Sequence, residues 1–169
     1  MSDGIAYKIN GLDELQAKLK SVSEDTQNKG GRFALRKAAQ VIQAKAKQNA
    51  ERVNDPATPK EIANNIAIRW SGKHFKSTGE LMFRVGVLGG AKGFAAASGE
   101  VKGRGKGNPG GDTYYWRFLE FGTSKMAAQP FLRDAIESNQ SEAISEFVNQ
   151  YNIAIDRAIK RAAKNGGLA

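Results

Sequence analysis

The strongest constraint on the fold is a long amphipathic pattern at the C-terminal end of the chain. Apolar residues recur every three or four positions from Phe131 to about Ala163, which is the spacing of one face of an α-helix. Acidic residues lie early in this segment and basic residues late, an order that complements the helix dipole. The pattern predicts one long helix that packs on another layer. The weak helix formers Ser138-Asn139-Gln140 mark the place where it could break.

The N-terminal part of the chain predicts two further helices. A short strand at Ala6–Ile9 is followed by helical spacing of leucines over Leu12–Leu19. The pair Gly30-Gly31 interrupts this pattern, and a longer helix is expected from about Arg32 to Arg52. The apolar stripe of that helix is rich in alanine, so we expect it to pack closely on a neighbouring helix.

The middle of the chain indicates β-structure. Ile66, Ile68 and Trp70 alternate with less apolar residues, as in a half-buried strand, and Leu81–Leu88 shows the same period. The intervening Ser71–Gly79 is polar and is expected to be a loop. We therefore predict an antiparallel hairpin.

Residues 89–111 form a glycine-rich basic segment. They contain nine of the 19 glycines and very little that a core could bury, so we expect a mobile loop. The tail 165–169 is expected to be disordered. The predicted fold is α+β in a single domain, 1–169, with N-terminal helices and a long C-terminal helix packed on a small antiparallel sheet.

The residues that carry chemistry argue against an enzyme. The chain has no cysteine, which excludes disulfides and thiolate metal sites. His74 is the only histidine, and it is interpreted as a solvated loop residue. The segment Gly105–Gly110 matches a dinucleotide-binding pattern, but neither a strand nor a helix is predicted beside it. We expect no catalytic residue, no metal and no cofactor.

The chain is basic, with 26 Lys+Arg against 17 Asp+Glu and a net charge of +9. Such a surplus indicates either an anionic partner or a solvated basic surface. The middle third holds most of the surplus, and its loop could lie against DNA phosphates without sequence preference. The candidate DNA contacts are Lys92, Lys102, Arg104 and Lys106. A small nucleic-acid-binding protein without enzymatic activity is therefore one alternative.

An aromatic cluster follows the basic loop. Five of the 14 aromatic residues lie within Tyr114–Phe121, at a spacing that fits a short helix or a strand, with the helix slightly favoured. Gly122 would end such a helix, and Pro130 suits the first turn of the next one. Glu120 lies among the aromatic rings, so it needs a donor: the Thr123 hydroxyl, a backbone N–H or an arginine of a neighbour.

This region resembles the tail-completion, or head–tail joining, family of long-tailed double-stranded DNA bacteriophages. The residues that carry the resemblance are Glu120-Phe121-Gly122-Thr123 and Pro130-Phe131-Leu132-Arg133. Asn10–Leu15 and Ala34–Ala39 are similar to the front end of the family. Two segments depart from its pattern: Ala127-Ala128, where a proline is common, and the exit of the second helix, Val53–Pro59.

The resemblance implies a structural protein of the virion neck or tail. Such a subunit would form a homo-oligomeric ring, with a hexamer favoured, that connects the DNA-filled head to the tail. Its partners would be itself, other neck and tail proteins and genomic DNA. No signal peptide or membrane segment is apparent, so assembly is expected in the host cytoplasm. The expected interface residues are Tyr114, Trp116, Phe118, Glu120, Phe121, Gly122, Lys125, Met126, Pro130, Phe131 and Leu132.

Overall fold

A computed structural model describes residues 24–53, 61–88, 109–111 and 113–164. In chain order the elements are α2 (Glu24–Arg52), α3 (Ile62–Asn65), β1 (Ile66–Trp70), α4 (Gly72–Thr78), β2 (Phe83–Val87), α5 (Trp116–Phe121) and α6 (Leu132–Lys164). The predicted first strand, the leucine-containing first helix, the loop over 89–108 and the tail lie outside the described residues. The α+β class is confirmed, with helices and one small antiparallel sheet.

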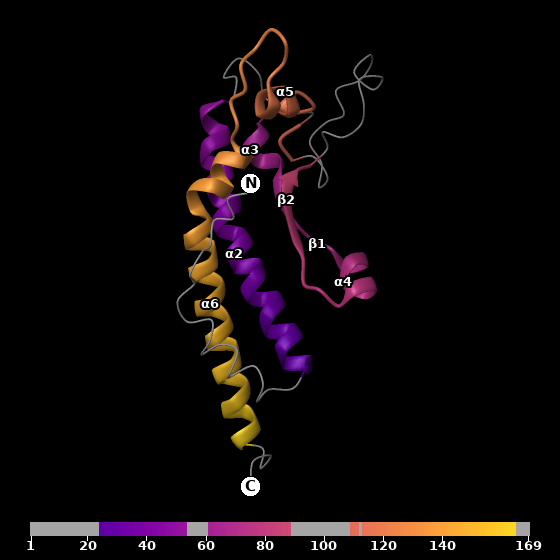
Figure 1. Cartoon of the computed structure of the whole chain (residues 1–169), viewed down its shortest axis with the longest axis vertical. Helices are drawn as coiled ribbons and strands as arrows, with labels where there is room; N and C mark the ends of the chain where they lie inside the picture. The colour runs from indigo at the N-terminus through magenta and orange to yellow at the C-terminus, as the bar shows by residue number, and fades with distance from the viewer. Residues whose placement is uncertain (1–23, 54–60, 89–108, 112, 165–169) are drawn as a thin grey trace, which may run out of the picture.

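Two long helices, α2 and α6, lie side by side and run in opposite directions (Figure 1). At one end the Asn49 side chain of α2 donates to the carbonyl of Phe131, 3.3 Å away. Near the other end Tyr151 of α6 donates its hydroxyl to the Gln27 carbonyl at 3.0 Å. The expected close packing is confirmed, because the α2 residues that face inward are small and buried. They are Ala34, Ala38, Ala46 and Ala50.

The predicted interruption at Gly30-Gly31 is wrong, because α2 begins at Glu24 and runs through both glycines. A Cβ on Gly30 would lie 3.2 Å from the Ala154 Cβ, and one on Gly31 would lie 3.3 Å from the Tyr151 ring. The missing side chains let α6 approach α2 closely, and this packing outweighs the poor helix propensity of glycine. The possible break at Ser138–Gln140 is not seen, since α6 is continuous from Leu132 to Lys164.

The hairpin is confirmed, with β1 and β2 antiparallel and Ile66 opposite Val87, Ile68 opposite Val85 and Trp70 opposite Phe83. The predicted loop between the strands is wrong over most of its length. It forms the helix α4, which ends at Gly79 in the left-handed conformation with φ 77°. We call residues 66–88 the arm.

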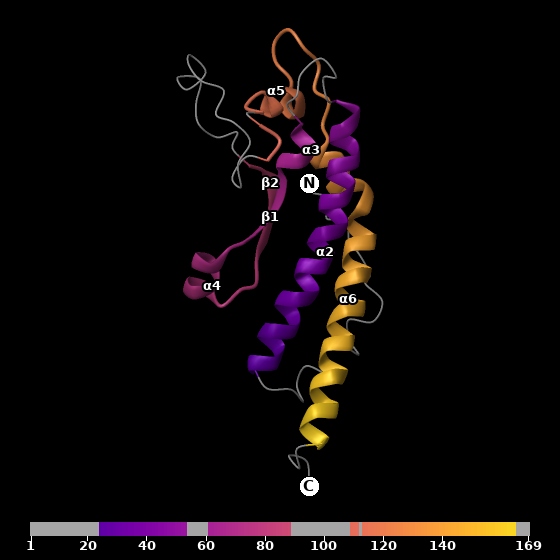
Figure 2. The ribbon, with the colours of Figure 1, turned by 180° about the vertical axis from the view of Figure 1, so that it is seen from behind.

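The arm contacts α2 through one face of its sheet. Ile66 is buried in the core, and its carbonyl accepts a hydrogen bond of 2.8 Å from the Gln43 side chain of α2. Trp70 packs on Phe83, with ring centroids 5.1 Å apart, and the guanidinium of Arg32 lies 4.3 Å from the centre of the Trp70 ring. Figure 2 shows the arm on the side of α2 that faces away from α6.

The core has two buried clusters along the α2–α6 pair. The larger contains Ala46, Ala50, Ile62, Ile66, Phe131 and Ala135, and the smaller contains Ala34, Tyr151 and Ile155. The larger cluster brings α2, α3, β1 and the start of α6 together at the end of the molecule that carries α5 (Figure 1). Within the described residues, no helix is long and apolar enough to cross a membrane.

The stability of the helix pair should depend on pH through Tyr151. Burial raises the pKa of its hydroxyl, because the charged phenolate loses water there. A raised pKa means that the folded state favours the protonated hydroxyl. The contribution of Tyr151 to the unfolding free energy is therefore complete below about pH 10 and is lost as the pH rises above that value. We expect the unfolding free energy, measured in urea, to fall more steeply above that pH in the wild type than in Tyr151→Phe. Equal slopes in the two proteins would contradict this.

Candidate assembly interface

The second part of the aromatic cluster forms the short helix α5, as favoured from its spacing, while Tyr114 and Tyr115 lie in the turn before the helix. The helix ends at Gly122, which has φ 73° and whose N–H donates to the Phe118 carbonyl at 2.9 Å. A Cβ on Gly122 would lie 2.9 Å from the backbone nitrogen of Ala128. Glycine is required here both for the backbone conformation and for the close approach of the following segment.

Glu120 connects α5 to the start of α6. Its side chain is 1% exposed, and its carboxylate accepts three backbone N–H groups, from Phe131 at 2.8 Å, Leu132 at 2.9 Å and Arg133 at 3.0 Å. These N–H groups belong to the first turn of a helix, where no intrahelical acceptor exists. The carboxylate therefore caps α6 and also complements the positive end of its dipole.

Arg133, in the first turn of α6, also binds Glu120. Its Nη2 donates to the Glu120 backbone carbonyl at 2.6 Å, and its Nε lies 3.5 Å from Glu120 Oε1. Its guanidinium also lies 5.5 Å from the centre of the Phe121 ring. The expectation that Glu120 needs a donor is confirmed, and the donors are backbone N–H groups and an arginine of its own chain.

The segment between the two helices contains a tight turn at residues 123–126. Thr123 and Met126 exchange backbone hydrogen bonds, with the Thr123 N–H donating to the Met126 carbonyl at 2.9 Å. The N–H of Gln129 then donates to the Leu119 carbonyl of α5 at 2.7 Å. These bonds and the Glu120 cap fix the angle between α5 and α6, so α5 is held rigidly on the end of the helix pair.

The predicted interface residues divide into two groups. Phe131, at 1% exposed, belongs to the core, while Trp116 and Leu132 are half-buried against it. Gly122, Met126 and Pro130 are also intermediate in exposure. The other group lies at the surface, with Phe121 64% exposed and Tyr114 and Phe118 each 36% exposed. Lys125 is also exposed. We name the residues Tyr114, Phe118 and Phe121 the aromatic surface.

A second connection, which was not predicted from the sequence, holds the N-terminal side of α5. Asn65 is fully buried at the end of α3, and its amide nitrogen donates to the Gly111 carbonyl and to Thr113 Oγ1, both at 2.8 Å. Its side-chain oxygen accepts the Gly110 N–H at 2.7 Å. The expectation that 89–111 is a mobile loop with little to bury is therefore wrong for its last residues, since Gly110 and Gly111 are buried. The DNA-contact candidates Lys92, Lys102, Arg104 and Lys106 lie outside the described residues.

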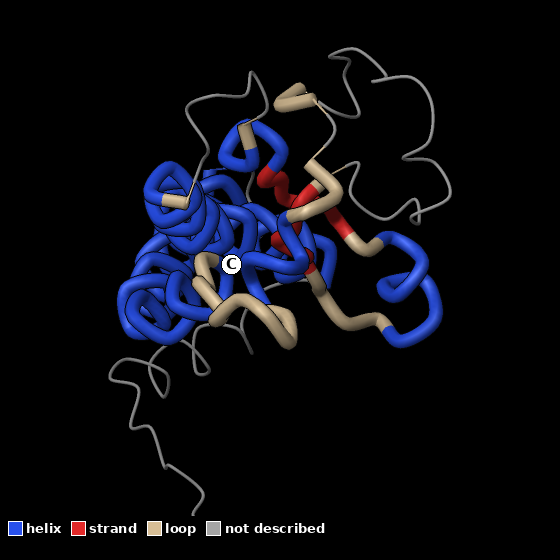
Figure 3. Tube along the Cα trace, turned by 90° about the horizontal axis from the view of Figure 1, so that it is seen from above, coloured by secondary structure: helices blue, strands red, loops and turns tan. Residues whose placement is uncertain are grey.

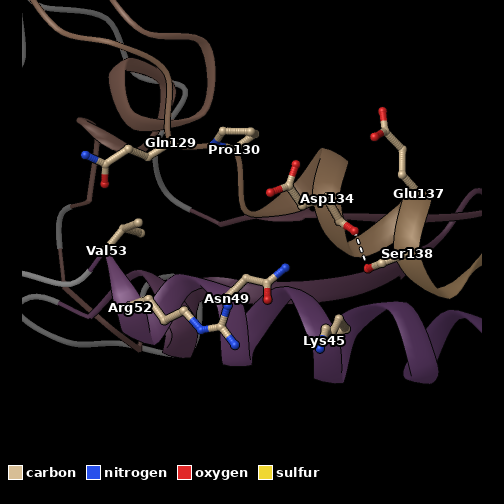
Figure 4. Close-up of a pocket in the computed structure, with 9 residues that line it drawn as sticks. All are labelled: Lys45, Asn49, Arg52, Val53, Gln129, Pro130, Asp134, Glu137 and Ser138. Carbon is tan, nitrogen blue, oxygen red and sulfur yellow. Dashed lines mark hydrogen bonds between the residues drawn. The ribbon is translucent and has the colours of Figure 1, made fainter.

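A shallow groove of about 630 Å³ lies beside this end, between the last turns of α2 and the first turns of α6. Figure 4 shows Asn49 of α2 pointing toward the start of α6, where Asp134 and Ser138 lie. Lys45 and Arg52 of α2 also line the groove, so its wall carries charges of both signs.

No catalytic constellation appears among the residues described. His74 lies in α4, where its Nε2 is 2.9 Å from the Glu80 carboxylate, and both groups are at the surface. In the same part of the chain, no three His, Asp or Glu side chains gather as a metal site would require. The prominent feature is a rigidly mounted aromatic surface.

A comparison with protein families assigns the chain. The family described as "Bacteriophage HK97-gp10, putative tail-component" matches residues 13–122, which is more than half of the chain. The chain belongs to this HK97-gp10-like family. No curated protein and no solved structure matches it. The resemblance to tail-completion proteins is thereby confirmed at the level of the family.

Membership in the HK97-gp10-like family makes the chain a component of a bacteriophage tail. Such a component is part of the virion and works in contact with other phage structural proteins. The match covers α2, the arm and α5 and ends at Gly122, so it includes the aromatic surface and the Glu120 side chain. The turn and α6, which hold α5 in place, lie after the end of the matched segment.

Proposed function

We propose that this HK97-gp10-like protein is a tail-completion or head–tail joining subunit that acts by docking and not by catalysis. Copies of it assemble into a ring, most simply a hexamer, that connects the DNA-filled head to the tail. The basic residues Lys92, Lys102, Arg104 and Lys106 of each copy would then contact the DNA that passes through the ring.

The observation that carries this proposal is that the aromatic surface is held in a fixed position on the subunit. Phe121 is the most exposed large apolar residue among those described, yet the residue before it is almost fully buried and fixes the helix in place. Phe118 and Phe121 share the short helix α5, and Tyr114 lies in the turn before it. Exposed aromatic residues grouped in this way are typical of protein interfaces. A preorganised helix loses little conformational entropy on binding, so more of the contact energy appears as affinity.

Removing the rings should strongly weaken assembly while the subunit still folds. We expect Phe118→Ser with Phe121→Ser to weaken association about a hundredfold, since burying each ring contributes roughly 1.5–3 kcal/mol and every 1.4 kcal/mol is tenfold. Sedimentation velocity of the protein, alone and with its neck partners, measures the assemblies. Electron microscopy of particles made with the variant should show filled heads without tails beside free tails.

A matched control uses exposed apolar residues elsewhere on the helix pair. Phe33 and Ile153 are 47% and 36% exposed, so Phe33→Ser with Ile153→Ser removes comparable surface far from α5. This control should assemble normally. Normal virions from the α5 variant, or equal defects in both variants, would overturn the proposed role of the aromatic surface.

A further inference from the structure

The arm has a second face that no described residue covers. Ile66 is buried in the core and Trp70 contacts Arg32 of α2, so the alternate positions of the strand point outward. There Arg69 lies opposite Arg84, and Ala67 lies opposite Gly86. Both arginines are exposed, and a Cβ on Gly86 would meet nothing within 4 Å. The outer face is thus a strip of small residues beside an arginine pair, a shape that admits the close approach of another surface.

The arginine pair is electrostatically unfavourable in the isolated chain. Like charges directly opposite each other on paired strands destabilise a hairpin. Neither Arg69 nor Arg84 forms an ion pair with a described residue. Glu80 is the only acid between residues 66 and 88, and it contacts His74 instead. Lys73 and Lys76 of α4 are also exposed, so the arm presents positive charge from its outer face to its tip.

The first half of α6 carries the opposite charge. Glu137, Glu142 and Glu146 are exposed or half-exposed, and none forms an ion pair with a described residue. Glu142 and Glu146 are four positions apart, so they repel each other on one face of the helix. The only basic residue from Leu132 to Tyr151 is Arg133, which is bound to Glu120. Small exposed serines separate the acids: Ser138, Ser141 and Ser145.

The two surfaces lie on opposite sides of the subunit. Figures 1 and 2 show α6 on one side of α2 and the arm on the other. Figure 3, the view from above, shows the strands to one side of most of the helical turns. One chain cannot bring its own arm to its own acidic helix half. Two copies can, and each copy then keeps one free surface of each kind for the next. Head-to-tail contacts of this type close into rings or extend into filaments.

We propose that the outer face of the arm of one copy docks on the acidic first half of α6 of a second copy. Arg69 and Arg84 then pair with the α6 glutamates, and Ala67 and Gly86 lie against its serines. Each surface relieves the like-charge repulsion of the other. This inference rests on the proposed ring, and it adds which surfaces meet between neighbouring subunits.

Cross-linking tests the contact directly, because the chain has no cysteine. One preparation carries Gly86→Cys and another carries Ser141→Cys, and the two are mixed with a short bismaleimide. We expect heterodimers to form at least about tenfold faster than when Gly86→Cys is mixed with Lys160→Cys, which labels the basic end of α6. Equal rates in the two mixtures would overturn the proposal.

A charge exchange identifies the interaction that drives docking. Arg69→Glu with Arg84→Glu keeps a like-charge pair on the hairpin, so folding should be little changed, but cross-linking to Ser141→Cys should fall about tenfold. Glu137→Arg with Glu142→Arg in the second preparation should restore it. If the exchange restores nothing and the arm variant instead loses binding to a double-stranded DNA oligonucleotide, the arm binds nucleic acid and the docking proposal is wrong.

The two proposals fail in different ways. Rings detected by mass, with arm cross-links no faster than the Lys160→Cys control, would remove the arm contact and leave the ring. The absence of any assembly, together with control-level cross-linking, would remove both.

Discussion

Glu120→Ala should unfold the protein at a much lower urea concentration than the wild type. The substitution removes three charge-assisted hydrogen bonds at once and leaves the N–H groups of Phe131, Leu132 and Arg133 without acceptors in a mostly buried position. An ordinary helix cap contributes about 0.5–2 kcal/mol, and each bond to a charged group about 1.5–3 kcal/mol. We expect a loss of about 3 kcal/mol of unfolding free energy, read from the urea midpoint at an unchanged slope.

Two companion substitutions separate the cap from the ion pair. Arg133→Ala removes the partner charge but leaves the three backbone bonds, and the Arg133 side chain is half-exposed, so its loss should cost less than about 1 kcal/mol. Glu120→Gln keeps the size of the side chain and one acceptor oxygen, so it should lie between the two. A loss in Glu120→Ala no larger than that in Arg133→Ala would show that the cap contributes little.

This prediction concerns assembly as well as stability. Without the cap, α5 is attached to α6 through the turn, the Gln129–Leu119 bond and the bond from Arg133 to the backbone carbonyl of residue 120. The aromatic surface would then sample several orientations, and docking would have to select one of them. Glu120 was predicted from the sequence as an interface residue; it is buried, and in the proposed interface it would act by orienting α5.

The elements that were predicted well from the sequence are those in which apolar residues recur at a regular spacing. Alternation at Ile66, Ile68 and Trp70 identified β1, and the long apolar stripe identified α6, because both patterns reflect which face is buried. The spacing of Tyr114, Phe118 and Phe121 favoured the helix α5 with Gly122 at its end, although the helix begins at Trp116 and Tyr114 lies in the turn before it.

The predictions that were wrong concern residues whose conformation depends on contacts with distant parts of the chain. The glycines at 30 and 31 look like a helix terminus until the approach of Tyr151 is known. The residues of α4 look like a polar loop because only Phe75 packs inward, where its ring lies 5.5 Å from that of Trp70. In the site, the donors to Glu120 are 11 to 13 positions away in the sequence. Their chemical type, a backbone N–H or an arginine, could be predicted because an acid among aromatic rings needs a donor. The partners of Asn65 are 45 or more positions away, and no local pattern indicates them.

Gly110→Ala should be as damaging as many core truncations, although it adds one methyl group. A Cβ at this position would lie 2.0 Å from the backbone oxygen of Glu61, which is far inside van der Waals contact. Backbone at both positions is fixed, since Gly110 accepts from the Glu61 N–H at 2.9 Å and donates to Asn65. The steric clash between the added Cβ and the Glu61 oxygen can be removed only if these bonds break. We therefore expect a loss of about 2–4 kcal/mol of unfolding free energy in urea.

Gly86→Ala provides the matched control, because its Cβ would enter open space and its backbone is ordinary strand. It should change the unfolding free energy by less than about 1 kcal/mol, and a gain is expected, since alanine reduces the entropy of the unfolded chain. Similar losses in both variants would contradict the close approach at Gly110. A large loss at Gly110 alone would show that the end of the glycine-rich segment is a structural anchor. Because the chain passes from this anchor through Thr113 into α5, the aromatic surface is then fixed from both sides, by Asn65 before the helix and by Glu120 within it.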